Sequence, residues 1–355
     1  MVMQRSTPAH ATAAATQAGD RAGLLDAATM REVFAAQAAE FADGSLILDD
    51  CTVLGATKKL RKLIVEYRLR AHHAAQTDAV EELPVIGKAY ARDRGAYAYA
   101  VMAALHARGF SADRGCAVPR PLAYLPEWRV LLQGKALGVQ LSSLLYHPDR
   151  GPAGAGQAAR WLARLHQSAL PEELAPRAEP RDGLEDYGRD LAAAYPGQRR
   201  SVQDLLTRLT DLLGEPSRET LVPTHGDYHP KNIFLDGPTV TVIDFDTFAL
   251  GEPARDLGYF LAQCAIMAYH KRGSFAPALA PIQAFLEGYR AAGLDPDLRR
   301  AARYVARAFF QSLHYELCVL HTGNHALIPV WLDQIAAWLA CAADPTTPLP
   351  LADWR

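Results

Sequence analysis

Hydrophobic residues change their spacing along the first third of the chain, and the change predicts a helix followed by strands. From Leu24 to about Phe41, large apolar residues recur at roughly helical spacing. Asp43-Gly44 then breaks the pattern. We expect the next elements to be strands at residues 46–54, 63–69 and 83–90, with a turn containing Gly55 between the first two.

In the middle of the chain, a helix and two strands are expected before the pattern becomes largely helical. An alanine-rich stretch predicts a helix that ends near Arg108. Two strands bounded by prolines are expected near residues 121–125 and 129–132, and a hinge near Gln133-Gly134-Lys135. Beyond the glycine-rich segment 151–156 the expected elements are a helix at 158–168, an exposed connection at 171–186, a hairpin of strands 232–235 and 240–244, helices up to Ala342 and a tail at 345–355.

Composition describes an ordinary soluble globular protein. The chain has 355 residues, of which 50% are hydrophobic, and a net charge of −2. This length allows two domains or one bilobal unit with a sizeable core. The near-neutral charge argues against a nucleic-acid partner. No apolar run reaches the length that crosses a membrane.

The N-terminal residues and the cysteines indicate the cellular compartment in which the protein is expected. The first 22 residues contain few large apolar side chains and lack the apolar core of a signal peptide, so we expect a disordered tail. The 5 cysteines are scattered without Cys-x-x-Cys spacing, which is typical of a reducing compartment. We therefore expect a cytoplasmic protein, and the sequence leaves the oligomeric state unknown.

The most informative stretch is His225-Gly226-Asp227-Tyr228-His229-Pro230-Lys231-Asn232, followed by Val242-Ile243-Asp244-Phe245-Asp246. Phosphoryl transfer from ATP needs a carboxylate at the acceptor hydroxyl and oxygen ligands that hold Mg²⁺ against the phosphates. Asp227 and Asn232 are 5 residues apart (232 − 227), which is the spacing of the catalytic aspartate and the metal-binding asparagine in protein kinases. Asp244 follows a short strand, where a second metal ligand belongs. The order, spacing and residue types predict a phosphotransferase site.

Each of these residues also has an ordinary structural explanation. A lone Gly-Asp often caps a helix or forms a turn, and Asn232 could form an Asx turn. The presence of Asp227, Asn232 and Asp244 in this order favours Asp227 as the base. A carboxylate that leaves a β-branched strand is costly unless it meets a cation, so Asn232 and Asp244 are expected to bind Mg²⁺. Asp246 is either a further ligand or a turn former.

Two histidines flank the candidate base, and a histidine base is conceivable. We expect His225 to be a structural residue packed behind the loop. His229 is expected to be a loop residue rather than a catalytic one.

Basic residues in the first third of the chain could contact a nucleotide. Lys88 lies inside an apolar strand, like the phosphate-contacting lysine of the V-A-I-K type, or is an edge lysine that reaches water. The helix that follows contains no glutamate to pair with it, and Asp93 is the substitute nearest in sequence. Lys58 and Lys59, in the expected turn 55–62, either draw the triphosphate electrostatically or form a solvated basic hairpin.

These motifs resemble the signature of the aminoglycoside phosphotransferase-like small-molecule kinases. That signature is H-G-D-x-x-x-x-N, a hairpin strand, D-x-D, and a D-P-A-x-D-L-like segment that here reads Gly251-Glu252-Pro253-Ala254-Arg255-Asp256-Leu257. The likeness covers most of the chain from about Leu46. It implies an α+β, bilobal protein-kinase-like fold. Its parts would be the tail at 1–22, a β-rich nucleotide-covering lobe at 23–134 and a helical lobe at 135–355.

The resemblance also implies roles for individual residues. In the catalytic loop 225–232, Asp227 would be the base, and Asp256 would brace this loop. Asn232 and Asp244, the latter in the segment 244–246, would bind magnesium. The residues that would contact ATP are Lys88, Gln133, Lys58 and Lys59.

We therefore expect an ATP- and Mg²⁺-dependent transfer of the γ-phosphate to a hydroxyl of a small molecule, such as a sugar, polyol, amino alcohol or aminoglycoside-like acceptor. The helices after Asp256 should select the acceptor. Residues 251–342 contain 7 acids and 8 lysines or arginines without an acidic cluster, so a polycationic aminoglycoside is not favoured. Tyr315 and Glu316 either touch the substrate or belong to the core.

Two other functions are weighed. A protein kinase is disfavoured because only 9 residues separate Asp246 from Asp256, too few for an activation segment. A catalytically weak kinase-fold binding or regulatory module is supported by the missing glutamate and the single glycine at residue 55. The complete set of Asp227, Asn232 and Asp244 argues against it.

Overall fold

The structure, a computed structural model, describes residues 21–59, 62–92, 94–169, 174, 183–216 and 220–354. These residues form two compact units. The first takes in the described residues up to His106 together with Pro119–Lys135, and the second takes in Ala107–Val118 and the residues from Ala136 onward. Residues 1–20 of the expected tail, Asp93 and most of the expected connection 171–186 lie outside the described residues.

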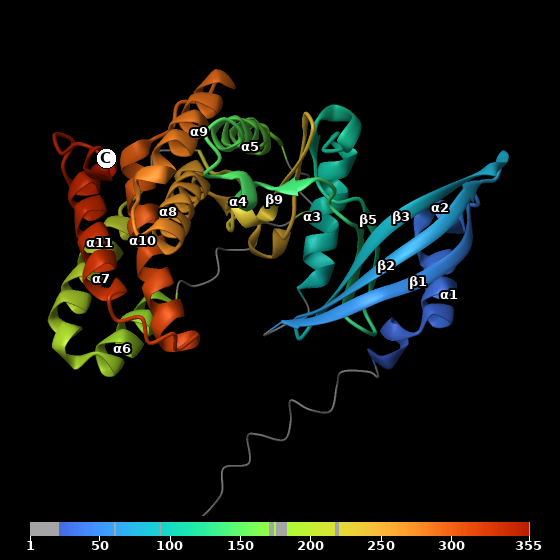
Figure 1. The fold of residues 1–355 in the computed structure, drawn as a ribbon, viewed down its shortest axis with the longest axis horizontal. Coiled ribbons are helices and arrows are strands. Elements are labelled where there is room, and N and C mark those ends of the chain that lie inside the picture. The colour runs from blue at the N-terminus through green and yellow to red at the C-terminus, as the bar shows by residue number, and fades with distance from the viewer. Residues whose placement is uncertain are drawn as a thin grey trace, which may run out of the picture. The chain divides into compact units, whose positions relative to one another are not determined.

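The first unit is built on a five-stranded antiparallel sheet with the order β1-β2-β3-β6-β5. Its strands are β1 (Leu46–Lys59), β2 (Lys62–His73), β3 (Gln76–Tyr90), β5 (Pro121–Leu125) and β6 (Val130–Gly134) (Figure 1). Helix α1 (Ala27–Gln37) covers one face, where the ring of Phe34 meets that of Tyr67 edge-on at 5.4 Å. Helix α3 (Gly95–Ala107) follows β3.

The helix expected from Leu24 to Phe41 is divided into three pieces, the 3-10 helix Arg21–Leu25, α1 and α2 (Ala39–Ala42). Met30 and Phe34 are fully buried, so the hydrophobic spacing identified the correct face. The division occurs at Ala38, whose backbone is extended (φ −82°, ψ 126°). Apolar spacing does not reveal such a local change of backbone conformation.

The turn expected around Gly55 is wrong. Strand β1 continues to Lys59, and Gly55 pairs with Glu66 of β2 next to a β-bulge at Val53/Gly55. A Cβ atom at Gly55 would meet nothing within 4 Å. The glycine therefore marks a bulge in a long hairpin strand rather than its end.

The second unit is mainly helical, and none of its described helices, nor any in the first unit, is long and apolar enough to span a membrane. Its helices are α4 (Leu141–Leu144), α5 (Arg150–His166), α6 (Leu184–Ala194), α7 (Arg199–Gly214), α8 (Pro253–Arg272), α9 (Leu279–Ala291), α10 (Leu298–His314) and α11 (Leu327–Ala343). Two small sheets have the orders β4-β10-β9-β7 and β11-β8. Their strands are β4 (Cys116–Ala117), β7 (Val139–Gln140), β8 (Val222–Thr224), β9 (Ile233–Asp236), β10 (Thr239–Val242) and β11 (Ala249–Gly251).

Helix α5 begins earlier than expected and includes the glycine-rich segment 151–156. A Cβ atom at Gly154 would lie 2.6 Å from a methyl group of Leu235. A Cβ atom at Gly288 of α9 would lie 2.8 Å from the carbonyl oxygen of Gly156. These glycines therefore serve close packing of α5 against α9 and β9, and they do not interrupt the helix.

Residues 107–118 are held within the helical unit by specific contacts. The indole Nε1 of Trp161 donates to the carbonyl oxygen of Ala117 at 2.9 Å, and the ring of Phe110 meets Trp161 at 5.5 Å. Strand β4 pairs in parallel with β10, the strand that leads to Asp244. The segment thus supports the strand from which a candidate metal ligand extends.

The expected C-terminal tail is wrong as well. Residues Pro350–Trp354 form a 3-10 helix, and Trp354 is only 4% exposed. Its ring stacks on Phe275 at 5.2 Å and meets Trp338 edge-on at 6.0 Å. Pro-rich composition suggested a loose end, but one aromatic residue fixes the segment to the core.

Replacement of this anchor tests its contribution to stability. We expect Trp354→Ala to lower the free energy of unfolding by about 3 kcal/mol, as for other buried tryptophans, because the variant leaves a cavity beside Phe275. Thermal or urea unfolding followed by circular dichroism measures the change. The exposed neighbour Asp353→Ala is the control and should shift it by less than about 0.5 kcal/mol. Equal stability of both variants would contradict the anchor.

Candidate active site

The candidate catalytic loop, residues 225–232, is held by one buried carboxylate. Asp256, in the first turn of α8, has an exposure of 0%. Its Oδ2 accepts a hydrogen bond from the backbone N–H of His225 and its Oδ1 accepts one from that of Gly226, both at 2.7 Å. The imidazole Nε2 of His166 lies 3.2 Å from the same Oδ2. The backbone at the start of the loop is therefore fixed by a charged acceptor.

Two opposing effects act on the pKa of Asp256. Burial raises this pKa, whereas the hydrogen bond and charge of His166, together with His225, lower it. The net pKa is below its usual value, so the carboxylate stays ionised and can accept all three hydrogen bonds. The sequence predicted a bracing role for Asp256, and these contacts confirm it.

His225 links the loop to the segment that carries Asp244. Its Nε2 donates to the carbonyl oxygen of Ile243 at 3.0 Å, and its Nδ1 accepts from the backbone N–H of Asp227 at 3.3 Å. This pairing requires the neutral imidazole with its proton on Nε2. Burial lowers the pKa of His225, which favours the same neutral form. His225 is thus the structural residue that the sequence indicated.

Gly226 occupies a position that admits no side chain. Its φ is 77°, and a Cβ atom would lie 2.4 Å from the carbonyl oxygen of Thr247. The Thr247 hydroxyl in turn donates to the carbonyl oxygen of His225 at 3.1 Å. The glycine allows the loop to lie against the segment after β10, and so it determines where Asp227 is placed.

The Asp227 side chain is one-third exposed (33%) and is surrounded by three polar residues. Asn232 Nδ2 lies 3.3 Å from its Oδ2, and His229 Nε2 lies 3.5 Å from the same oxygen. The Tyr259 hydroxyl also interacts with this carboxylate. Burial raises the pKa of Asp227, but the nearby His229 and His225 bring it below its usual value. The group is therefore ionised at neutral pH.

Asn232 and Asp244 lie at adjoining ends of the β9–β10 hairpin. The backbone N–H of Ile243 donates to the carbonyl oxygen of Asn232 at 2.9 Å, which holds the two segments side by side. Asp244 has a left-handed backbone (φ 73°), a conformation that is uncommon outside glycine, and its charge raises the pKa of Asp227. The structure thus brings Asp227, Asn232 and Asp244 together, while Asp246 lies in the 3-10 helix Phe245–Thr247.

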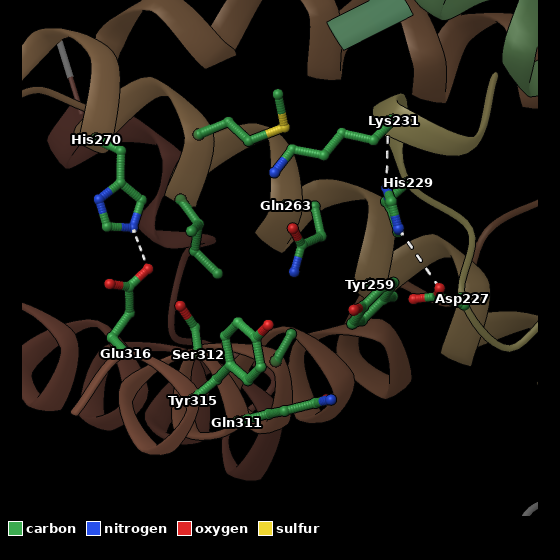
Figure 2. A pocket seen from close by; sticks show the side chains of 13 residues that line it. Asp227, His229, Lys231, Tyr259, Gln263, His270, Gln311, Ser312, Tyr315 and Glu316 are labelled. Carbon is green, nitrogen blue, oxygen red and sulfur yellow. Dashed lines mark hydrogen bonds and ion pairs between the residues drawn. The ribbon is translucent and has the colours of Figure 1, made fainter. Parts of the chain in front are cut away.

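A pocket of about 420 Å³ opens from Asp227 between α8, α10 and the π-helix Tyr315–Val319. Figure 2 shows Asp227 and His229 at one end and His270 and Glu316 at the other. The residues that line it are Asp227, His229, Lys231, Tyr259, Gln263, Ile266, Met267, His270, Ala308, Gln311, Ser312, Tyr315 and Glu316.

In the first unit, the pairing of strands places three of the expected nucleotide-contacting residues on one face of the sheet. Lys88 pairs with Leu131 and Gln133 with Ile86 across β3 and β6, so Lys88 and Gln133 are diagonal neighbours. Lys59 shares their face, whereas Lys58 pairs with Leu63 on the face that packs against α1. Because β3 is a central strand and Lys88 is only 7% exposed, Lys88 is not an edge lysine.

The model of the phosphotransferase enzyme family matches residues 84–304, more than half of the chain. The chain belongs to this family. The matched residues include the phosphotransferase motif from His225 to Asn232, the segment at Asp244 and the bracing Asp256. None of the curated proteins matches the sequence.

Solved structures show the same fold as this phosphotransferase. A spectinomycin phosphotransferase in complex with ADP and spectinomycin is 12% identical, with a TM-score of 0.57 over 91% of this chain and 99% of that one. An amicoumacin kinase in complex with AMP-PNP, Ca²⁺ and amicoumacin is 15% identical, with a TM-score of 0.57 over 92% and 96%. A choline/ethanolamine kinase family protein from Mesorhizobium loti is 19% identical, with a TM-score of 0.50 over 92% and 99%. The expected α+β protein-kinase-like fold is confirmed.

Several residues that line the pocket of the phosphotransferase were not predicted from the sequence. Tyr259, Gln263, Met267 and His270 follow one another by three or four positions along α8, so they share a face. A face that mixes polar and apolar residues on an otherwise buried helix was the available signal. His229, expected to be a loop residue, lies against the Asp227 carboxylate.

Two glycines of the phosphotransferase, one in the catalytic loop and one in the turn between β9 and β10, form a matched pair for a test. Gly226 and Gly237 both have positive φ, 77° and 56°, but a Cβ atom at Gly237 would meet nothing within 4 Å. We expect Gly237→Ala to cost about 1 kcal/mol through backbone strain alone. Gly226→Ala should cost roughly 2 kcal/mol more, because a Cβ atom collides with Thr247. Melting temperatures of the two variants measure the difference, and equal losses would show that the collision is relieved without cost.

Proposed function

We propose that this phosphotransferase uses Mg²⁺ and ATP to phosphorylate a hydroxyl of a small molecule bound in the pocket between α8 and α10. The observation that carries the proposal is the position of Asp227. Its carboxylate lines the pocket and also contacts Asn232, beside Asp244. One residue thus connects a cavity of ligand size with a set of oxygen ligands.

Asp227 would receive and orient the acceptor hydroxyl. An ionised carboxylate accepts a hydrogen bond from this hydroxyl and directs its oxygen toward the phosphate. Asn232 and His229 both face Oδ2 of Asp227, which fixes the rotation of the carboxylate. Orientation of this kind is the main contribution of the protein in phosphoryl transfer, because the transition state is loose.

Asn232 and Asp244 would hold Mg²⁺, which neutralises charge on the phosphates when it is bound. Their amide and carboxylate oxygens are hard ligands of the type that Mg²⁺ prefers. In the part of the chain that the structure describes, no group of three His, Cys, Asp or Glu residues could hold a metal ion without other ligands. A site with two protein ligands suits Mg²⁺, which takes the rest from phosphates and water.

The nucleotide would lie against the sheet face that carries Lys88, Gln133 and Lys59. Lys88 would contact the phosphates as a buried cation. The Oε1 atom of Gln133 is buried and has no hydrogen-bond partner among the described residues, so a nucleotide base could supply the missing donor. The position of Lys58 on the opposite face gives no support to its expected contact. The relatives with ADP and AMP-PNP make a nucleotide the natural second substrate.

The acceptor would be a hydroxylated metabolite or antibiotic. Spectinomycin and amicoumacin, bound by two structural relatives, are the first compounds to assay. The reaction would take place in the cytoplasm, in keeping with five cysteines that form no disulfide.

Two substitutions separate catalysis from metal binding. We expect Asp227→Asn to lower turnover by about 10²–10⁴-fold with little change in Mg-ATP affinity, because the neutral amide cannot accept the proton. Asp244→Asn should weaken the magnesium-dependent part of ATP binding. Calorimetric titration with ATP, with and without Mg²⁺, and an assay of ADP release measure both. Wild-type turnover in Asp227→Asn would show that the assigned base is wrong.

A second pair of variants tests the sheet face. Lys88→Met should raise KM for ATP by about tenfold, a loss of about 1.4 kcal/mol, because a buried phosphate contact disappears. Lys58→Met removes a lysine from the other face of the same sheet and should leave KM within about twofold. Steady-state kinetics at varied ATP concentration give both values. A larger effect from Lys58 would place the nucleotide on the other face.

A further inference from the structure

The end of the pocket remote from Asp227 is occupied by one carboxylate. Glu316 lies in the π-helix Tyr315–Val319, directly after α10, and its side chain is 19% exposed. Its Oε1 lies 3.4 Å from Nε2 of His270, which extends from the last turn of α8. At 3.4 Å the contact is longer than a normal hydrogen bond, and it is an ion pair only when His270 is protonated. The carboxylate therefore retains most of its capacity to accept hydrogen bonds.

Glu316 faces the cavity because it lies four residues after Ser312 and eight after Ala308, on one helical face. A π-helix accommodates one more residue per turn than an α-helix, and such segments are frequent at functional sites. Here Gln311 and Ser312 of α10 line the pocket, and Tyr315 and Glu316 at the start of the π-helix extend the same wall (Figure 2). The carboxylate and Asp227 thus face one cavity from opposite ends.

The other lining residues limit the positive charge of a ligand that the pocket can bind. Among the described lining residues, Asp227 and Glu316 are the acids, and Lys231 is a cation whose side chain extends toward the middle of the pocket (Figure 2). A further cation, Arg307, acts on Tyr259. The rest of the wall consists of neutral or apolar residues and two histidines: Tyr259, Gln263, Gln311, Ser312, Tyr315, Ile266, Met267, Ala308, His229 and His270. A polycationic ligand would bury ammonium groups that find no carboxylate, which is costly.

From this arrangement we infer that the acceptor is a polyhydroxylated molecule with a single basic amino group, and that Glu316 determines this specificity. The amino group binds Glu316 through a charge-assisted hydrogen bond. The hydroxyl that receives the phosphate lies at Asp227, and the hydroxyls between them meet the amides of Gln263 and Gln311. The inference rests on the proposed function, since it names the acceptor of that same site.

A panel of matched acceptors tests it in an assay of ADP release. Glucosamine, ethanolamine and 2-aminoethyl maltoside each carry one amine. Their N-acetyl derivatives lack the charge, and kanamycin represents polyamines. We expect at least one mono-amine to show a kcat/KM at least ten times that of its N-acetyl form and of kanamycin. Glu316→Gln should remove this preference, and Glu287→Gln, an exposed residue of α9 outside the pocket, should preserve it.

Three outcomes overturn the inference. One is an N-acetyl or polyamine acceptor that is used as well as the mono-amine, and another is a preference that survives Glu316→Gln. The third is an absence of turnover with every mono-amine. Magnesium-dependent ATP binding, measured by calorimetry on the same protein, separates these failures from a failure of the proposed function, which would lack it.

Discussion

The charge of Asp256 is the constraint on which the catalytic region depends. An ionised carboxylate that is completely excluded from water is costly unless charge-stabilising donors surround it. Two backbone N–H groups and one imidazole meet that need, and in doing so they fix the start of the loop. Through His225 the same constraint reaches Ile243, next to Asp244. A single buried charge thus positions the candidate base and one candidate metal ligand, which belong to different segments.

The parts of the site that the sequence predicted are those encoded in short segments. Asp227, Asn232 and Asp244 are separated by only one loop and one hairpin, so the local chain geometry already brings them near one another. The pocket is different, because residues from Tyr259 to Glu316 meet through the packing of two helices. Spacing along one chain segment does not reveal which face of α8 meets which face of α10.

The fold was predicted where the hydrophobic pattern is regular. It was predicted wrongly where a single residue determines the local conformation. The strands of the first sheet and the β9–β10 hairpin followed from the sequence pattern, whereas the helices after the hairpin were predicted only as a group, and the short strands β4, β7, β8 and β11 were not predicted. Gly55 resembled a turn but accommodates a bulge, and the proline-rich end near Trp354 resembled a tail but is anchored by a single ring. Likeness to relatives at such low identity describes the scaffold and leaves the acceptor to the side chains of the pocket.

The π-helix at Tyr315–Val319 has a consequence for the part of the chain that follows the pocket. A π turn arises by insertion of one residue into an α-helix, and its loss would rotate the residues beyond it by about 100°. Glu316 lies at the start of this turn, at α-helical spacing from Ser312, so it would keep its place, and the change would reach the residues after Val319. The braced loop around Asp256 lies outside this segment and would keep its geometry. Indels of one codon at this helix end would therefore alter the connection to α11 and leave the pocket wall and the braced loop in place.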